Sequence, residues 1–367
     1  MIVESVSATD LRNLRGCIYL RPGLNILLGP NGEGKTNWLE AIFISALGRS
    51  FRTSKLGESI RFEFEAASVS AEVRESAEVL RKLGVGIGER SKQLFINDKK
   101  AKPNEYSGNL SVVLFNSDEL EVIRGGPDAR RRFMDEGIEG LHPPFRKVFA
   151  DYQRVMRQKN ALLAKASDGG WGAHQLRDAL QPWNEQLIEL SSKIHRARVR
   201  FVERLSNVLE KRLFSREDVS LRYRSSLEGK GDLDNYAELI AERLDLRLDA
   251  ELAAGHSLIG PHRDDLEILF DGKDMRKFGS SGQQRSALLL LQLAGIEVFN
   301  ATRGEYPVFL IDDIDAELDY RRIGKLLEYL RGKTQTIVTT SKESLIDRFG
   351  DEANVIRIEG GAARGPA

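Results

Sequence analysis

The sequence predicts an α/β head domain interrupted by an inserted helical arm. An apolar strand expected at Leu24–Leu28 leads through a glycine-rich loop into an amphipathic helix. From about Asp128 to Leu213 the pattern is helical, and from Val308 to Ile358 strand and helix alternate. We therefore expect a first lobe at 1–125, a helical arm at 126–216, a second lobe at 217–360 and a flexible tail at 361–367.

The composition is that of a soluble globular chain whose charges balance. Among 367 residues, 41% are apolar, and 55 Lys and Arg face 55 Asp and Glu, for a net charge of +0. A uniformly basic coat is excluded, so nucleic acid would need local basic surfaces. The single cysteine, Cys17, excludes an internal disulfide and Cys–Cys zinc motifs. No secretory signal or membrane-spanning stretch is visible, so we expect a cytoplasmic protein that does not bind membranes.

The first lobe contains an expected phosphate site. Besides two segments in which apolar and polar residues alternate, Ile60–Glu65 and Ser68–Val73, this lobe has the clear strand that leads into the phosphate site. Its glycines let backbone N–H groups turn toward phosphate oxygens, and the following helix adds its positive end. Lys35 would reach the β and γ phosphates of ATP, and the Thr36 hydroxyl would ligate Mg²⁺. A structural glycine turn is the alternative. The expected ATP-binding residues are Gly29, Pro30, Asn31, Gly32, Glu33, Gly34, Lys35, Thr36 and Asn37.

The helical arm is expected to be a short antiparallel hairpin that turns at Ser167–Gly170. Apolar residues of the second arm recur at steps of four and three, which defines a heptad seam. These residues are Leu176, Leu180, Trp183, Leu187, Leu190, Ile194, Ala197 and Phe201. The first arm offers a partner seam of Phe145, Phe149, Tyr152, Met156 and Leu163. Pro182 predicts a kink or a late start of the second arm.

The second lobe supplies further candidate site residues. The apolar strand from Val308 ends in Asp312, which would bind the metal, and Asp313, which would position or deprotonate the attacking water. Taken alone, two acids at a strand end also fit a solvated loop or a helix cap. The segment Gly279–Arg285 precedes a helix expected at Ser286–Asn300 and forms a second possible anion site, or a plain N-cap.

These motifs together resemble the ATP-binding-cassette superfamily and, within it, the RecF family of bacterial recombinational repair proteins. The matches run from the first to the last fifth of the chain. Besides the phosphate loop, the Ser280 segment and Asp312-Asp313, the matching segments are Leu11–Asn13, Pro22–Asn25, Gly48–Arg52, Gly126–Phe133, Gly260–Asp265 and Ala316–Asp319.

The resemblance implies a head in which two copies clamp two ATP molecules head to tail. Ser280 would be the signature serine, with Gln283 beside it, and would contact the γ phosphate held by Lys35 of the opposite subunit. Asp319 would lie in the loop that crosses the dimer interface. The implied partners are duplex DNA, junctions of single- and double-stranded DNA, and the mediators RecR and RecO, which help to load RecA.

The sequence also departs from transporter cassettes. Ser281 replaces their glycine, and Asp313 replaces their usual glutamate, so we expect slow hydrolysis. Their switch histidine has no counterpart, and Thr340 is a candidate γ-phosphate sensor. Phe115–Asp118 is a candidate for their glutamine loop. Other candidates remain open: Arg12 and Arg52 either approach phosphates or form salt bridges, and His262 either stabilises the signature region or is structural.

Basic residues near the arm suggest a DNA contact through the phosphate backbone. Between positions 193 and 212, seven positive residues face only Glu203 and Glu210. A solvated helix face is the alternative. The candidate DNA-binding residues are Arg130, Arg131, Arg132, Lys193, Arg196 and Arg200.

Two other functions compete with a DNA-binding ATPase. A cassette coupled to a membrane transporter is disfavoured by the long chain between Lys35 and Ser280 and by the missing histidine. A chromosome-organising ATPase needs a long coiled coil, and the seam spans only about four heptads.

Overall fold

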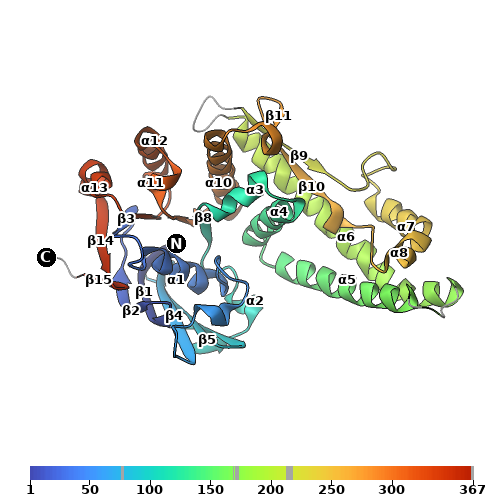
Figure 1. Ribbon diagram of the computed structural model, residues 1–367, viewed down its shortest axis with the longest axis horizontal. Helices are drawn as coiled ribbons and strands as arrows, with labels where there is room; N and C mark the ends of the chain where they lie inside the picture. The colour runs from blue at the N-terminus through green and yellow to red at the C-terminus, as the bar shows by residue number, and fades with distance from the viewer. Residues whose placement is uncertain (76–77, 168, 170–172, 212–217, 365–367) are drawn as a thin grey trace. The chain divides into compact units, whose positions relative to one another are not determined.

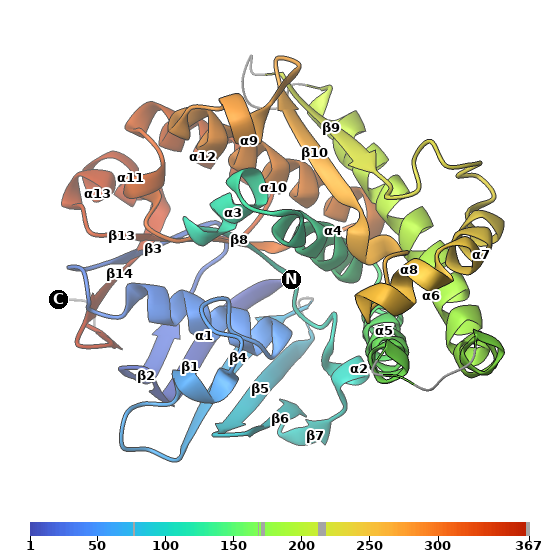
Figure 2. The same ribbon diagram turned by 45° about the vertical axis from the view of Figure 1, so that its right-hand side comes forward.

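The computed structural model describes residues 1–75, 78–167, 169, 173–211 and 218–364 (Figures 1 and 2). The chain forms two compact units, which we call the split unit (Met1–Leu120 and Leu288–Ala367) and the inserted unit (Glu121–Ala287). By their contacts, residues 218–287 therefore group with the helical arm, although the sequence pattern assigned them to the second lobe.

The first sheet of the split unit is antiparallel, with the strand order β2-β1-β4-β5-β6-β7. Its strands are β1 (Ile2–Leu11), β2 (Leu14–Tyr19), β4 (Ala66–Arg74), β5 (Leu80–Gly88), β6 (Ser91–Ile96) and β7 (Lys99–Ala101). Helix α1 (Lys35–Leu47) contacts β1, β4 and β5 of this sheet and β13 of the next one, so it lies between the two sheets (Figure 2). The core between them includes Trp38, Leu39 and Ile42.

The second sheet of the split unit has the order β15-β14-β3-β13-β12-β8, and every pair except β14–β15 is parallel. Its strands are β3 (Leu24–Leu28), β8 (Val112–Phe115), β12 (Val308–Ile311), β13 (Thr336–Thr340), β14 (Ala353–Glu359) and β15 (Ala362–Ala363). The carboxyl ends of parallel strands meet at one edge, so this topology gathers the residues that follow β3, β8, β12 and β13.

Most helices of the split unit flank the second sheet. Figure 1 shows α11, α12 and α13 on the side of that sheet away from α1. Helix α10 (Ser281–Arg303) begins in the inserted unit and continues into the split unit. The remaining elements are α2 (Pro103–Tyr106), α11 (Ile314–Glu317), α12 (Tyr320–Leu330), α13 (Glu343–Phe349) and the 3₁₀ turns Leu56–Ser59, Asp118–Leu120 and Gly350–Glu352.

The expected strands are confirmed in most places. Strand β3 has the predicted bounds, β4 includes Ser68–Val73, and strand and helix alternate from Val308 onward. The alternation at Ile60–Glu65 was misleading, because only Ile60 makes a bridge, to Leu11. Glu63 has φ 70°, and the Phe62 side chain is 88% exposed. Without a sheet face to bury its apolar residues, this segment forms a turn.

The inserted unit contains the predicted hairpin. Helices α5 (Phe145–Ser167) and α6 (Ala173–Leu209) pack along each other, and Asp168 and Gly170 of the predicted turn lie outside the described residues. The other elements are α3 (Glu121–Arg124), α4 (Pro127–Leu141), β9 (Val219–Arg224), α7 (Tyr236–Leu246), α8 (Leu248–Ala254), the 3₁₀ turn Pro261–Arg263, β10 (Asp265–Phe270), β11 (Lys273–Asp274) and α9 (Met275–Phe278). No helix in the described part of the chain is both long and apolar enough to span a bilayer.

The heptad seam of α6 faces its neighbours as predicted. Leu176, Leu180, Leu187, Ile194 and Phe201 are buried, and the seam's other members are half-buried. Pro182 lies inside α6, which starts nine residues earlier, so it does not delay the helix. Its missing N–H removes one helical hydrogen bond, to the Asp178 carbonyl.

Buried polar contacts tie Gly260–Asp265 to the hairpin. Arg198 is 4% exposed and donates to both Asp135 carboxylate oxygens at 2.8 and 2.9 Å and to the Pro261 carbonyl at 2.7 Å. The Tyr152 hydroxyl lies 2.8 Å from Nδ1 of His262, whose pKa burial lowers to about 4. His262 is therefore neutral near pH 7, and its contacts within the inserted unit are those of a structural residue.

A buried ion pair joins α5 to α8. The Lys159 ammonium lies 2.7 Å from Glu251, and both side chains are almost fully buried. Glu251 also accepts hydrogen bonds from Ser257 Oγ and Leu258 N, each at 2.8 Å. We expect Glu251→Ala to lower the free energy of unfolding by about 3–5 kcal/mol, because it leaves a buried ammonium without its counter-charge. Thermal denaturation followed by circular dichroism measures this loss.

The control is the double substitution Lys159→Met with Glu251→Gln. It removes both charges and keeps an acceptor for Ser257 and Leu258, so most of the lost stability should return. A double variant as unstable as Glu251→Ala would contradict this explanation.

Candidate nucleotide site

The phosphate loop follows β3 and is shaped so that three of its positions require glycine. Gly32 and Gly34 have φ of +90° and +101°, in the left-handed region. A Cβ on Gly29 would lie 2.4 Å from the Ile358 carbonyl oxygen. The loop is also held from outside, since Gly361 N donates to the Glu33 carbonyl at 2.8 Å. The result is a fixed backbone cradle at the start of α1, which fits a polyphosphate.

Lys35 lies over this cradle. Its side chain is largely buried, and Nζ donates to the carbonyls of Gly29 at 2.7 Å and Pro30 at 2.8 Å. Burial lowers the pKa of Lys35, an effect that Asp313 and Asp312 oppose. The ammonium is thus oriented by the loop and can reach phosphate oxygens bound there.

The Thr36 hydroxyl meets Asp312, although the two residues are far apart in sequence. Thr36 Oγ1 lies 2.8 and 3.0 Å from the two Asp312 carboxylate oxygens, and Thr339 Oγ1 donates to Asp312 at 2.7 Å. A hydroxyl and a carboxylate side by side are the hard oxygen ligands that Mg²⁺ prefers. The predicted metal pair is therefore brought together, and Thr339 orients its acid. No sequence signal singled out Thr339 for this contact.

Asp313 follows Asp312 with a left-handed backbone, φ 50°. Its N–H donates to Thr339 Oγ1 at 2.7 Å. Burial raises the pKa of Asp313, and the neighbouring Asp315 and Asp312 raise it further. A carboxyl with a raised pKa suits a group that accepts a proton from water.

Thr340, the candidate sensor, is fully buried and donates to Asp315 at 2.5 Å. Asp315 in turn forms an ion pair with Lys342 at 3.1 Å. No motif in the sequence pointed to Asp315 or Lys342. Asn116, in the candidate glutamine loop, follows β8 at the same sheet edge and accepts from Glu119 N at 3.0 Å.

Glu40, on α1, determines where the flanking arginines lie. Its carboxylate is fully buried and accepts from Arg12 at 3.0 and 3.1 Å and from Ser50 Oγ at 2.6 Å. Arg52 lies 3.6 Å from Glu40 and donates to the Asn37 amide oxygen at 2.6 Å. Both arginines therefore form salt bridges, and Asn37 of the predicted site is linked to this network. This role of Glu40 was not predicted from the sequence.

The signature segment forms a helix start. Ser280 N donates to the Gln283 amide oxygen at 2.9 Å, and Gln283 N donates back to Ser280 Oγ at 3.3 Å. Because of this reciprocal cap, α10 starts at Ser281 rather than at the predicted Ser286. Ser280 is exposed and belongs to the inserted unit. Asp319, also exposed, caps α12 by accepting from Arg322 N at 2.9 Å.

The candidate DNA-binding arginines of α4 differ in exposure. Arg130 is buried, and its guanidinium donates to Asp265 at 2.7 and 3.0 Å. This ion pair leaves Arg130 little surface for a DNA phosphate. Arg131 is half-buried and donates to the Asp264 carbonyl at 2.6 Å, whereas Arg132 is exposed.

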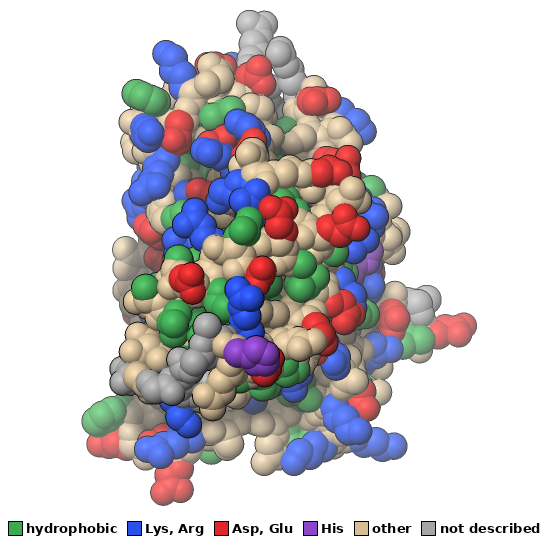
Figure 3. Space-filling view, turned by 90° about the vertical axis from the view of Figure 1, so that its right-hand side faces the viewer, with side chains coloured by type: hydrophobic (Ala, Val, Ile, Leu, Met, Phe, Trp, Pro, Cys, Tyr) green, Lys and Arg blue, Asp and Glu red, His purple; other side chains and the backbone are tan. Residues whose placement is uncertain are grey.

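The basic candidates of α6 are exposed. Lys193 pairs with Glu189 at 2.5 Å, Arg196 donates to the Ser192 carbonyl at 3.2 Å, and Arg200 is also exposed. Arg212, at the end of the basic stretch, lies outside the described residues. In Figure 3 Lys and Arg are spread over the face shown, most densely toward its upper left, and are mixed with Asp and Glu.

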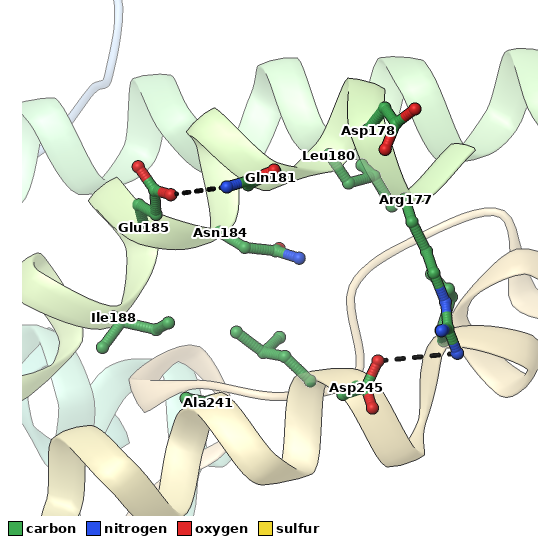
Figure 4. Close-up of a pocket in the computed structure, with 11 residues that line it drawn as sticks. Arg177, Asp178, Leu180, Gln181, Asn184, Glu185, Ile188, Ala241 and Asp245 are labelled. Carbon is green, nitrogen blue, oxygen red and sulfur yellow. Dashed lines mark hydrogen bonds and ion pairs between the residues drawn. The ribbon is translucent and has the colours of Figure 1, made fainter. Parts of the chain in front are cut away.

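A cavity of about 300 Å³ lies within the inserted unit, between α6 and α7 (Figure 4). Leu180, Ile188 and Leu244 contribute apolar lining, and Arg177 pairs with Asp245 at 3.5 Å. The cavity contains none of the predicted site residues, so we assign it no part in nucleotide binding.

The fold and the site define the class of protein. A phosphate loop between β3 and α1, acids after β12 and an inserted helical hairpin are the parts of an ATP-binding-cassette type of head. The family model described as "RecF/RecN/SMC N terminal domain" matches residues 2–362.

Similar proteins identify the family within this class. The DNA replication and repair protein RecF of Halothermothrix orenii is 35% identical over 352 residues, which cover 93% of this chain and 92% of that protein. RecF of Acetivibrio thermocellus is 36% identical over 372 residues, 98% of this chain and 99% of that protein. A solved structure of the recombination mediator protein RecF with ATP has a TM-score of 0.89 and 30% identity, covering 100% of this chain and 97% of the other. The chain belongs to the RecF family, as its motifs predicted.

Proposed function

We propose that this protein is a cytoplasmic DNA-binding ATPase of recombinational repair and replication. In this proposal ATP drives dimerisation, the dimer clamps duplex DNA at gaps or at junctions of single- and double-stranded DNA, and RecO and RecR then help to load RecA. The observation that carries it is the assembled site of Lys35, Thr36 and Asp312, in a chain that matches ATP-bound RecF over its whole length.

Each residue of the site has a proposed task. Lys35 and the loop N–H groups bind the phosphates, and Thr36 with Asp312 holds Mg²⁺, which would neutralise phosphate charge. Asp313 accepts a proton from water at its carboxylate. Ser280 and Gln283 of one subunit would contact the nucleotide bound to the other, with Asp319 at the interface. The proposed DNA contacts that are exposed are Arg132, Lys193, Arg196 and Arg200, and Arg131 is partly exposed.

The test is fluorescence anisotropy of a labelled duplex titrated with protein in ATP and Mg²⁺, in ADP and Mg²⁺, and without nucleotide, at two salt concentrations. Tighter, salt-sensitive binding in ATP alone is the expected result, because phosphate contacts release counterions. Binding that ignores the nucleotide would contradict the clamp.

Asp313→Asn should slow ATP hydrolysis by about 100-fold to 10,000-fold, since an amide cannot accept the proton of water. ATP-dependent dimers should persist. Burial holds the pKa of Asp313 above its ordinary value of 3.8, so hydrolysis should fall as the pH drops through this raised pKa. The rate of phosphate release at a series of pH values measures both the loss of hydrolysis and its pH dependence. The control is Asp351→Asn, which changes an exposed aspartate. An active Asp313→Asn variant would remove Asp313 from this role.

A further inference from the structure

The first sheet of the split unit has one face covered by α1 and one face that α1 does not reach. Leu83, Val85, Ile87 and Leu94 point to the α1 side, where they are buried. Strand alternation therefore turns the residues between them to the opposite face. From β5, β6 and β7 this set is Lys82, Gly84, Gly86, Gly88, Ser91, Gln93, Phe95 and Lys100.

This half of the face is flat, and none of its β5, β6 and β7 residues is an acid; the one carboxylate paired with it is that of Asp98, at the hairpin tip. Three glycines of β5 have no side chain, and Phe95 lies across two of them, 3.5 Å from a Cβ built on Gly84 and 3.6 Å from one built on Gly86. Its low relief lets a broad, rigid ligand approach.

Unpaired cations border this flat face. Lys100, opposite Phe95, points to this face, whereas Lys99, opposite Ile96, points to the α1 side of the same edge strand. These two lysines, Lys102 just after β7 and Arg90 in the turn before β6 are exposed and form no ion pair with any residue that the structure describes. The acid at the hairpin tip, Asp98, is already paired with Lys82 at 2.9 Å. Glu105 accepts a hydrogen bond from the backbone N–H of Lys102 at 2.9 Å. Glu89 stands beside Arg90 in the turn, and Glu72 of β4 lies opposite Lys82.

The opposite half of the same sheet is different. There, Arg15 pairs with Asp10 at 2.9 Å and Arg74 pairs with Glu4. The positive charge on β1, β2 and β4 is thus compensated locally, while that of the β6–β7 hairpin is not. The chain as a whole has a net charge of +0, so the excess of positive charge on this hairpin is local and does not reflect the overall composition.

The backbone of the hairpin that carries these cations is fixed by its turn and by strand β5. Its turn, Asn97-Asp98, has positive φ at both residues, 49° and 61°, the pattern of a tight two-residue turn. Asn97 also bonds to β5 twice, donating N–H to the Lys82 carbonyl at 2.8 Å and accepting from Lys82 N at 2.9 Å. Lys99 lies opposite Ile96, and the chain from Ile96 back along β6 to Arg90 is about 20 Å long. This length corresponds to about six base pairs of duplex DNA.

We propose that this surface, which we call the β7 lysine surface (Arg90, Lys99, Lys100 and Lys102), binds the phosphate backbone of duplex DNA. It is a second contact, separate in sequence from the basic residues of α4 and α6. It rests on the proposed function, since it adds to the DNA interface of the same protein. Its flatness and its exposed cations without ion partners fit a backbone contact, and the described residues of the surface offer no groove-reading element.

The test compares duplex DNA binding by the wild type and by the triple variant Lys99→Gln, Lys100→Gln and Lys102→Gln, in ATP and Mg²⁺ over a series of salt concentrations. Loss of up to three phosphate contacts should reduce the slope of log K against log salt by about 2 to 3. Affinity at low salt should fall at least about tenfold. The matched control replaces the same lysines by arginine, which keeps the charge and should bind as the wild type does.

ATP affinity and the melting temperature of the Gln variant should equal those of the wild type, so that folding defects are detected. An unchanged salt slope, with a wild type that binds DNA, would overturn this inference alone and leave the proposed function intact. If the Gln variant keeps its DNA affinity but self-associates, the lysines instead protect an edge strand from pairing, which also overturns it. A wild type that binds no DNA would overturn both proposals.

Discussion

Replacement of Lys35 by alanine should abolish ATP-dependent dimerisation, because it should weaken ATP binding by about 30-fold to several thousand-fold. Losing one partner of a buried, hydrogen-bonded charge pair costs about 2–5 kcal/mol. Lys35 would form such a pair with the phosphates of ATP, since its ammonium is largely buried and aligned by the carbonyls of Gly29 and Pro30. Titration of a fluorescent ATP analogue gives the affinity, and light scattering after gel filtration gives the dimer.

The matched control is Lys325→Ala, which removes an exposed lysine from α12 of the same unit. It should leave ATP affinity unchanged. Because Lys35 also bonds to its own loop, the melting temperature of Lys35→Ala without nucleotide shows whether the loop has collapsed. ATP-dependent dimers of normal affinity in Lys35→Ala would mean that the nucleotide binds elsewhere.

The sequence predicts best those parts of the fold that depend on neighbouring residues. The strand, loop and helix around Gly29–Thr36 form one contiguous pattern, and the α6 seam repeats over many residues. Strands β5 to β7 were not predicted, because Gly84, Gly86 and Gly88 weaken the β signal. Their strand pairing, and the packing of Phe95 over two of the glycines, come from tertiary structure.

The candidate site shows the same limit. Thr36 and Asp312 could be predicted because each stands at a motif with a known chemical task. Glu40 and Thr339 could not, since a glutamate on a helix and a threonine at a strand end are ordinary residues until the fold places them beside Arg12 and Asp312. Likewise, the sequence does not reveal that Arg130 faces an acid 135 positions away.

Ser280→Arg should abolish ATP-dependent dimers while leaving ATP binding to the monomer unchanged. Ser280 is exposed, outside the phosphate loop and in the inserted unit, whereas the loop and its Lys35 belong to the split unit. The proposed function gives Ser280 a partner only in the second subunit, where a long cationic side chain would not fit. Dimer mass in ATP and the affinity of the dilute monomer for ATP separate these two effects.

Ser280→Ala distinguishes a lost contact from a damaged helix start. Alanine removes the hydroxyl that accepts from Gln283 N, at a cost of about 1 kcal/mol to the cap, but adds no bulk. If the serine contacts the partner's nucleotide, Ser280→Ala should weaken the dimer and Ser280→Arg should eliminate it, with similar melting temperatures. If Ser280 is only a cap, both variants should lower the melting temperature equally and still dimerise, and the head-to-tail arrangement would then lose its main support in this chain.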